Sequence, residues 1–162
     1  MFTFYKKHNN KLYNKLVELS RNKFFYKEIG LDDDFETRIL LIFFHLSSIL
    51  KISKKDGNRK KTQEIFDNIF LNIEYHIREL GFGDVAVNKK MKDMNKIFYD
   101  ILVKFEEQKD QANLLKKYFS SKIKKEDQNI QVLADYFLKF DNFCFDLDND
   151  NMLNGSINFN YR

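Results

Sequence analysis

The sequence predicts an all-α fold, a single compact domain over residues 1–162 in which about six helices pack as an antiparallel bundle. The chain of 162 residues is long enough to bury one self-sufficient core. It contains no proline and only 5 glycines, so long helices are permitted and the turn signals of a many-stranded sheet are missing. Apolar residues also recur at helical spacing in almost every segment.

The N-terminal third predicts two helices. Residues 10–28 place three leucines on one helical face and continue into an aromatic turn. Three aspartates at 32–34 then start a second helix, because carboxylates can cap a helix or complement the positive end of its dipole. As far as Leu50 this helix is apolar nearly all round, so we expect it to be central. His45 on it is expected to be a core residue with a hydrogen-bonded ring.

A glycine corner is predicted in the middle of the chain. The most basic stretch, residues 51–61, is expected to be a loop because it contains an Asp-Gly-Asn turn, and a helix over residues 62–80 follows it. Gly81 stands where a left-handed C-cap residue is needed, and Gly83 gives the reversal a second permissive joint. Asp84 then supplies a side-chain acceptor for the free amides of the next helix.

The helix that begins at Asp84 and extends to about residue 108 has one apolar seam. Its seam residues are spaced by four, three, four, three and four positions: Val87, Met91, Met94, Phe98, Ile101 and Phe105. A group of lysines lies off this seam: Lys89, Lys90, Lys92 and Lys96. A shorter helix around Leu114 and a last helix around Phe137 follow. Residues 145–162 are expected to form an irregular C-terminal segment.

Residue spacing gives no support for a catalytic or metal site. Cys144 is alone, so an internal disulfide is impossible and no zinc-binding pattern exists. Alternating aspartates after position 145 resemble a calcium loop, but Asn151 and Ile157 occupy the places of its required glycine and glutamate. Nucleophile, phosphate-loop and dinucleotide patterns are also missing. We therefore expect no cofactor and no bound metal.

The charge of the chain is mildly basic, with 28 Lys and Arg against 24 Asp and Glu and a formal net charge of +4. The off-seam lysines and residues 51–61 could together form a basic face for RNA, an anionic membrane or an acidic partner, against the default of a solvated helix face. The most apolar stretch, Ile39–Leu50, is shorter than the ~20 residues of a membrane-spanning helix. No signal-peptide pattern is present, so the protein is expected to stay where it is made.

The glycine corner also carries a resemblance to a known family. The run over residues 74–99, with Arg-Glu-Leu-Gly-Phe-Gly-Asp at 78–84 and Lys-Lys-Met at 89–91, closely resembles the signature of the ubiquinol-cytochrome c chaperone family. Three further blocks look like other parts of that family: residues 21–46, 133–136 and 152–159. The chain departs from the family pattern at Asn72, at Asp34 and at Asp100, which stands where a glycine commonly follows Phe-Tyr.

The resemblance implies a non-enzymatic assembly factor of respiratory complex III that binds newly made cytochrome b. It also implies a cytoplasmic protein at the inner face of the inner membrane, or on the matrix side in mitochondria. The ribosome and an anionic membrane surface are implied as further partners, and a small-molecule substrate is not. A client-binding surface at the corner would use these residues: Arg78, Glu79, Gly81, Gly83, Asp84, Lys89, Lys90, Met91, Lys92 and Met94.

Two other classes stay open from the residues alone. A ribosome- or RNA-associated basic helical module would use residues 51–61, and its binding would weaken steeply with salt. An enzyme would need a concave polar site around His45 or Glu79.

Overall fold

The structure, a computed structural model, describes residues 10–106, 111–123 and 126–161. Seven α-helices make up most of these residues, and the only β pairing among them is one isolated antiparallel bridge between Leu31 and Ile123. The predicted all-α fold is therefore confirmed. The helices are α1 (Lys11–Ser20), α2 (Phe35–Ser53), α3 (Arg59–Glu79), α4 (Asp84–Glu106), α5 (Gln111–Phe119), α6 (Glu126–Asp146) and α7 (Asn149–Leu153).

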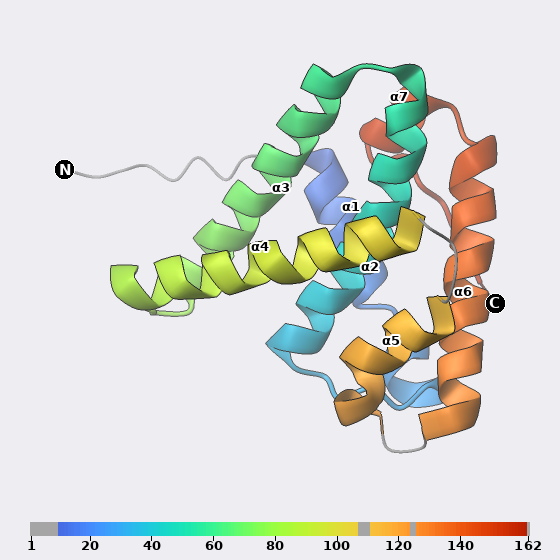
Figure 1. Ribbon diagram of the computed structural model, residues 1–162, viewed down its shortest axis with the longest axis horizontal. Coiled ribbons are helices and arrows are strands. Elements are labelled where there is room, and N and C mark those ends of the chain that lie inside the picture. Colours follow the sequence, from blue (N-terminus) through green and yellow to red (C-terminus); the bar gives the residue numbers. More distant parts are fainter. Residues whose placement is uncertain (1–9, 107–110, 124–125, 162) are drawn as a thin grey trace.

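Helix α2 is the central element that the sequence predicts. Asp34 caps it, since one carboxylate oxygen accepts from the Thr37 N–H at 2.8 Å. The helix packs against α1, α4 and α6, and every residue from Ile39 to Leu50 is buried. Figure 1 shows α2 in the middle of the molecule with α4 crossing in front of it. Among the described helices, none is both long and apolar enough to cross a membrane.

His45 lies fully buried in the aromatic core, as predicted. Its Nδ1 lies 2.6 Å from the Leu41 carbonyl oxygen, which can only accept, so Nδ1 carries the proton. Its Nε2 therefore accepts a hydrogen bond from the Tyr136 hydroxyl at 2.7 Å. Burial lowers the pKa of His45 to about 4, so the ring is neutral at physiological pH. Both ring nitrogens are thus satisfied within the core, which removes His45 as a candidate catalytic base.

The basic segment at 51–61 is not the loop that its composition predicts. Helix α2 continues to Ser53, and α3 begins at Arg59 after a single 3-10 turn. Lysine and arginine are good helix formers, so only the turn residues interrupt the helices. Gly57 takes the left-handed conformation with φ 70°, and the Asn58 side chain caps α3 by accepting from the Lys61 N–H.

The first helix is shorter than predicted. Helix α1 ends at Ser20, and the aromatic residues after it form a separate π-helical turn over Phe24–Glu28. The Tyr26 hydroxyl in this turn donates to the Ser20 carbonyl at 2.6 Å, which ties the turn back to the end of α1.

The C-terminal segment contains more regular structure than the irregular chain predicted over residues 145–162. Helix α6 continues to Asp146 and α7 follows it, after which the chain makes a turn and has no regular secondary structure. This last part packs on the core, because Ile157 is buried and Phe159 and Tyr161 both contact the Tyr136 ring. Gly155 lies directly against the backbone of Lys11 at the start of α1.

Candidate functional site

The corner between α3 and α4 is a tight reversal. Gly81 has φ 93°, the left-handed conformation predicted for it, and its N–H donates to the Arg78 carbonyl at 3.0 Å. Gly83 has no positive φ. Its carbonyl instead accepts the first hydrogen bond of α4, from the Val87 N–H at 2.9 Å, so Gly83 takes the N-cap position predicted for Asp84.

An ion pair closes the corner. Asp84 is the first residue of α4, and its carboxylate lies 2.5 Å from the Arg78 guanidinium. Arg78 also lies 3.5 Å from Glu74, one helical turn back on α3. The charge of Asp84 complements the positive end of the α4 dipole, as predicted, although it does so from inside the helix. Arg78 and Asp84 therefore connect the two helices across the corner and are already partly occupied by each other.

Apolar side chains are exposed at the tip of the corner. Leu80 is 52% exposed, Phe82 43% and Val85 85%, and Glu79 beside them is also exposed. The ammonium group of Lys90 lies 4.6 Å from the centre of the Phe82 ring, a cation–π contact that holds the ring at the surface. We call Leu80 and Phe82 together the corner tip. Figure 1 shows the corner at the edge of the molecule remote from α6.

Of the ten residues predicted for the site, four lie on α3 or in the corner and six lie on α4, where they divide between two sides of the helix. Met91 and Met94 are half-buried and pack against the core, so they support the helix rather than face a partner. Lys89 and Lys92 point to solvent on the other side. The structure therefore brings together the tip, the Arg78–Asp84 pair and Lys90, and it separates Lys89 and Lys92 from them.

A groove next to the tip was not predicted. Its volume is about 250 Å³, and Leu80 of the corner tip forms part of its wall. Its other apolar lining comes from α1 and α2, and its polar lining includes His76 of α3. The full lining is Tyr13, Val17, Ser20, Arg21, Asp33, Asp34, Phe35, Arg38, Ile39, Ile42, His76 and Leu80. An apolar surface therefore runs from the exposed tip into a concave site.

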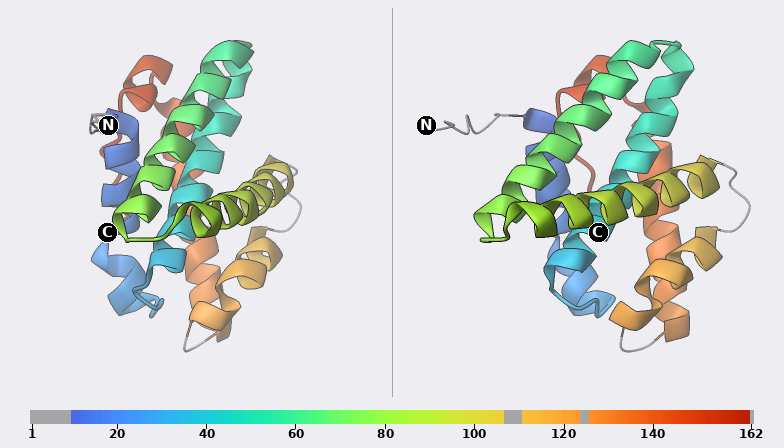
Figure 2. Two further views of the ribbon diagram at one scale, coloured as in Figure 1. Left: turned by 90° about the vertical axis from the view of Figure 1, so that its left-hand side faces the viewer. Right: turned by 60° about the vertical axis from the view of Figure 1, so that its left-hand side comes forward.

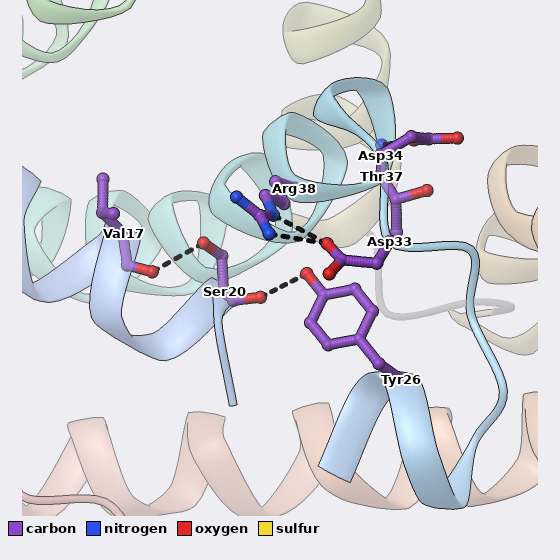
Figure 3. A network of polar contacts seen from close by, with 7 residues as sticks. All are labelled: Val17, Ser20, Tyr26, Asp33, Asp34, Thr37 and Arg38. Carbon is purple, nitrogen blue, oxygen red and sulfur yellow. Dashed lines mark hydrogen bonds and ion pairs between the residues drawn. The ribbon is translucent and has the colours of Figure 1, made fainter. Parts of the chain in front are cut away.

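The polar rim of this groove is held in place by hydrogen bonds (Figure 3). Arg38 donates from Nε to Asp33 at 2.9 Å, and a second guanidinium nitrogen lies 2.7 Å from the same carboxylate oxygen. Ser20 donates to the Val17 carbonyl at 2.7 Å. Burial raises the pKa of Tyr26, whose hydroxyl donates to the Ser20 carbonyl, so the phenol stays protonated. The polar groups at the edge of the groove are thus already paired with one another, and they surround an apolar floor.

A second set of ion pairs links the rim to the 3-10 turn Ser120–Lys122 that follows α5. Lys122 lies 3.1 Å from Asp34 and 3.0 Å from Glu36. Burial by itself would raise the pKa of Asp34, but the Thr37 N–H and Lys122 outweigh it, so the pKa lies below its usual value. Asp34 stays ionised and keeps both its cap and its lysine near neutral pH.

The groove residues carried no sequence signal that would place them near the corner. Tyr13 and Val17 lie on α1, and Asp33 lies in the connection before α2, far from Leu80 along the chain. The apolar spacing identified each residue's own helix face. Long-range packing decides which helix ends lie together, and a single sequence does not reveal that packing.

Comparisons with known proteins agree with this architecture. The family model described as ubiquinol-cytochrome C chaperone matches residues 27–159, a range that includes the corner and α2 but not α1. The crystal structure of the Cbp3 homolog from Brucella abortus is similar, with 23% sequence identity and a TM-score of 0.73. This likeness covers 91% of the chain and 85% of the Brucella chain, and it shows the fold. The comparison with curated proteins finds no significant match.

Proposed function

Because the chain belongs to the ubiquinol-cytochrome c chaperone family, we propose that it holds newly made cytochrome b while respiratory complex III is assembled. The family gives the coarser role, a chaperone in the assembly of ubiquinol-cytochrome c reductase. That the protein acts without catalysis is part of the proposal. The client and its binding surface are the finer proposal. The location proposed with them is the cytoplasmic face of the inner membrane, or the matrix side in mitochondria.

The client is held by the corner tip and the groove that continues from it. The observation that carries this proposal is that exposed Leu80, two residues before exposed Phe82, also lines the groove. Fully burying a leucine or phenylalanine side chain stabilises a complex by about 1.5–3 kcal/mol. Covering the half-exposed side chains of Leu80 and Phe82 therefore contributes part of the binding free energy of the client. Lys90 and the paired charges of the rim meet the polar ends of the client segment.

Crosslinking in cells tests this surface directly. A photo-activated amino acid replaces Phe82, and the matched control replaces Leu138, an apolar residue on α6 that is at least as exposed. We expect cytochrome b peptides to be crosslinked from position 82 and not from position 138, as read by mass spectrometry. Equal yields from both positions would show that the contact is non-specific.

Removing the corner tip should weaken client holding. Leu80→Ser combined with Phe82→Ser exposes no new core, because both side chains are already half in solvent. We expect several-fold less cytochrome b co-purified with the protein and a matching fall in complex III. The control pair Leu138→Ser and Phe145→Ser, also exposed, should change neither. Unchanged cytochrome b and complex III after deletion of the whole gene would rule the function out.

A second candidate, an RNA- or ribosome-associated module, is favoured by one observation. Lys54, Lys55, Arg59 and Lys60 are all exposed around the turn between α2 and α3. RNA binding through this turn would weaken steeply with salt and would be lost in the variant Arg59→Gln with Lys60→Gln. Salt-independent or undetectable binding to a structured RNA rules this candidate out and leaves client holding unaffected.

A further inference from the structure

Helix α4 carries a second stripe of side chains on the face opposite its apolar seam. The stripe has the same spacing of four, three, four, three and four positions, and its members are Val85, Lys89, Lys92, Lys96, Tyr99 and Val103. Each member lies two positions before a residue of the buried seam, which is about 200° around an α-helix. The seam residues Val87, Phe98, Ile101 and Phe105 are fully buried, and all six stripe residues are exposed. We call these six residues the outer stripe.

The two ends of the outer stripe are apolar and its centre is cationic. Val85 is 85% exposed at one end, and Tyr99 and Val103 are 51% and 54% exposed at the other. The three lysines lie between them, and none of them forms an ion pair within residues 10–106, 111–123 and 126–161. Two acids near the stripe are engaged elsewhere, since Asp84 pairs with Arg78 and Asp100 with Lys104 and Lys117. Asp93 is exposed beside the stripe and leaves it a net positive charge.

The outer stripe is long, straight and on the outside of the molecule. From Val85 to Val103 it spans ~27 Å at 1.5 Å per residue. Figure 1 shows α4 crossing in front of α2, and the right-hand view of Figure 2 shows the whole length of α4 on the near side of the molecule. A straight exposed row of side chains matches a flat partner better than a groove-bound peptide.

We propose that the outer stripe docks the protein on the surface of an anionic lipid bilayer. The two valines enter the boundary between headgroups and acyl chains, and Tyr99 lies at headgroup level with its hydroxyl in water. The lysines extend along the apolar surface and place their ammonium groups at lipid phosphates. RNA fits less well, because binding to single strands needs several stacking rings and the stripe has one aromatic residue. This docking uses residues other than the corner tip and needs no client.

Flotation with lipid vesicles and the purified protein tests the proposal. The probes are neutral phosphatidylcholine vesicles and vesicles with about 30% phosphatidylglycerol, in low salt near 0.05 M and high salt near 0.5 M. We expect binding to the anionic vesicles in low salt only. Lys89→Gln, Lys92→Gln and Lys96→Gln together should lower the partition coefficient roughly a hundredfold, from about a fivefold contribution of each lysine.

Two further variants separate the outer stripe from overall charge. The matched control replaces three exposed lysines on other elements, Lys23→Gln, Lys27→Gln and Lys116→Gln, which changes the net charge by the same amount. It should keep binding within about threefold of the wild type. Val85→Ser with Val103→Ser should weaken binding roughly tenfold with the salt dependence retained. Circular dichroism confirms that each variant is folded.

Equal losses of vesicle binding in the two triple-lysine variants would overturn the proposal, and so would equal binding to neutral and anionic vesicles. It would also be overturned if single-stranded RNA displaced the protein from vesicles through the same lysines. Because no client is present, a negative vesicle result leaves cytochrome b holding intact. A failed crosslink at position 82 likewise leaves membrane docking intact.

Discussion

At the scale of single residues, His45 shows how a polar side chain is accommodated in an aromatic core. Its ring lies edge-on to Phe137 and Phe140, with centroid distances of 5.0 and 4.8 Å, and its two nitrogens are both hydrogen-bonded. The sequence predicted a buried, bonded histidine because no other ligand or base stands near it along the chain. The partner Tyr136 could not be predicted, since it comes from α6 and is brought to α2 only by packing.

The neutral His45 makes stability depend on pH. Its pKa is about 4 in the folded protein and ~6.5 in the unfolded chain, so the unfolded state binds a proton first as the pH falls. Stability is therefore complete above pH ~6.5 and falls between pH ~6.5 and ~4, by up to about 3 kcal/mol. Urea titrations at pH 7, 6 and 5 should show this decline; a constant free energy of unfolding would contradict it.

The Asp141 carboxyl changes stability with pH in the direction opposite to His45, so its contribution needs a control. Burial raises the pKa of Asp141, so its folded form takes up a proton more readily and gains stability as the pH falls. Repeating the urea titration in an Asp141→Asn background removes this contribution. The decline assigned to His45 should then be steeper or unchanged.

At the scale of elements, periodicity predicted most of the helices and composition misplaced their ends. The seam of α4 was predicted in full, because four of its residues are completely buried and its two methionines pack on the core. Residues 51–61 were predicted as a loop because charge and a single turn motif were given more weight than the helix propensity of lysine. Spacing identifies which side chains share a face, and only tertiary packing decides whether that face is covered.

Asp100 joins α4 to α5 and should matter for that junction. Its carboxylate accepts hydrogen bonds from Tyr118 and Lys117 of α5 and pairs with Lys104 one turn along α4. Burial would raise the pKa of Asp100, but these bonds outweigh it and hold the pKa well below its usual value. Asp100 thus links α4 to α5 through charged hydrogen bonds.

Asp100→Asn should lower the free energy of unfolding by about 1–2 kcal/mol, because a charged hydrogen bond and two half-exposed ion pairs are weakened together. Amide hydrogen exchange should rise in α5 more than in α2. Asp93→Asn on the same helix is the control, since Asp93 is exposed, and its effect should stay within about 0.5 kcal/mol. Equal effects of the two variants would show that Asp100 is not a junction residue.

At the scale of the whole molecule, the C-terminal segment closes the fold over its first helix. Gly155 has φ 79°, and a Cβ placed there would lie 2.6 Å from the Lys11 carbonyl oxygen. The sequence predicted this segment as irregular because its polar composition hides a few buried residues. The sequence also predicted only part of the candidate site. The corner was identified, but the groove beside it was not, because its lining comes from three separate parts of the chain.

Gly155→Ala should destabilise the protein by more than about 2 kcal/mol, because backbone strain and a clash with α1 add together. Gly57→Ala is the matched control, with φ 70° and open space around its Cα. It should cost only about 1 kcal/mol. Thermal unfolding measures both, and equal shifts in Tm would mean that the segment does not press against α1.

The contact between Gly155 and Lys11 also has a consequence for synthesis. A chain that leaves the ribosome from its N-terminus can form α1 early, but the surface that covers the start of α1 does not exist until residue 155 has been translated. Contacts between such distant residues are slow to form, because closing a long loop costs entropy before the contact is gained. The packing over the start of α1 is therefore completed later than the local turns of the helix itself.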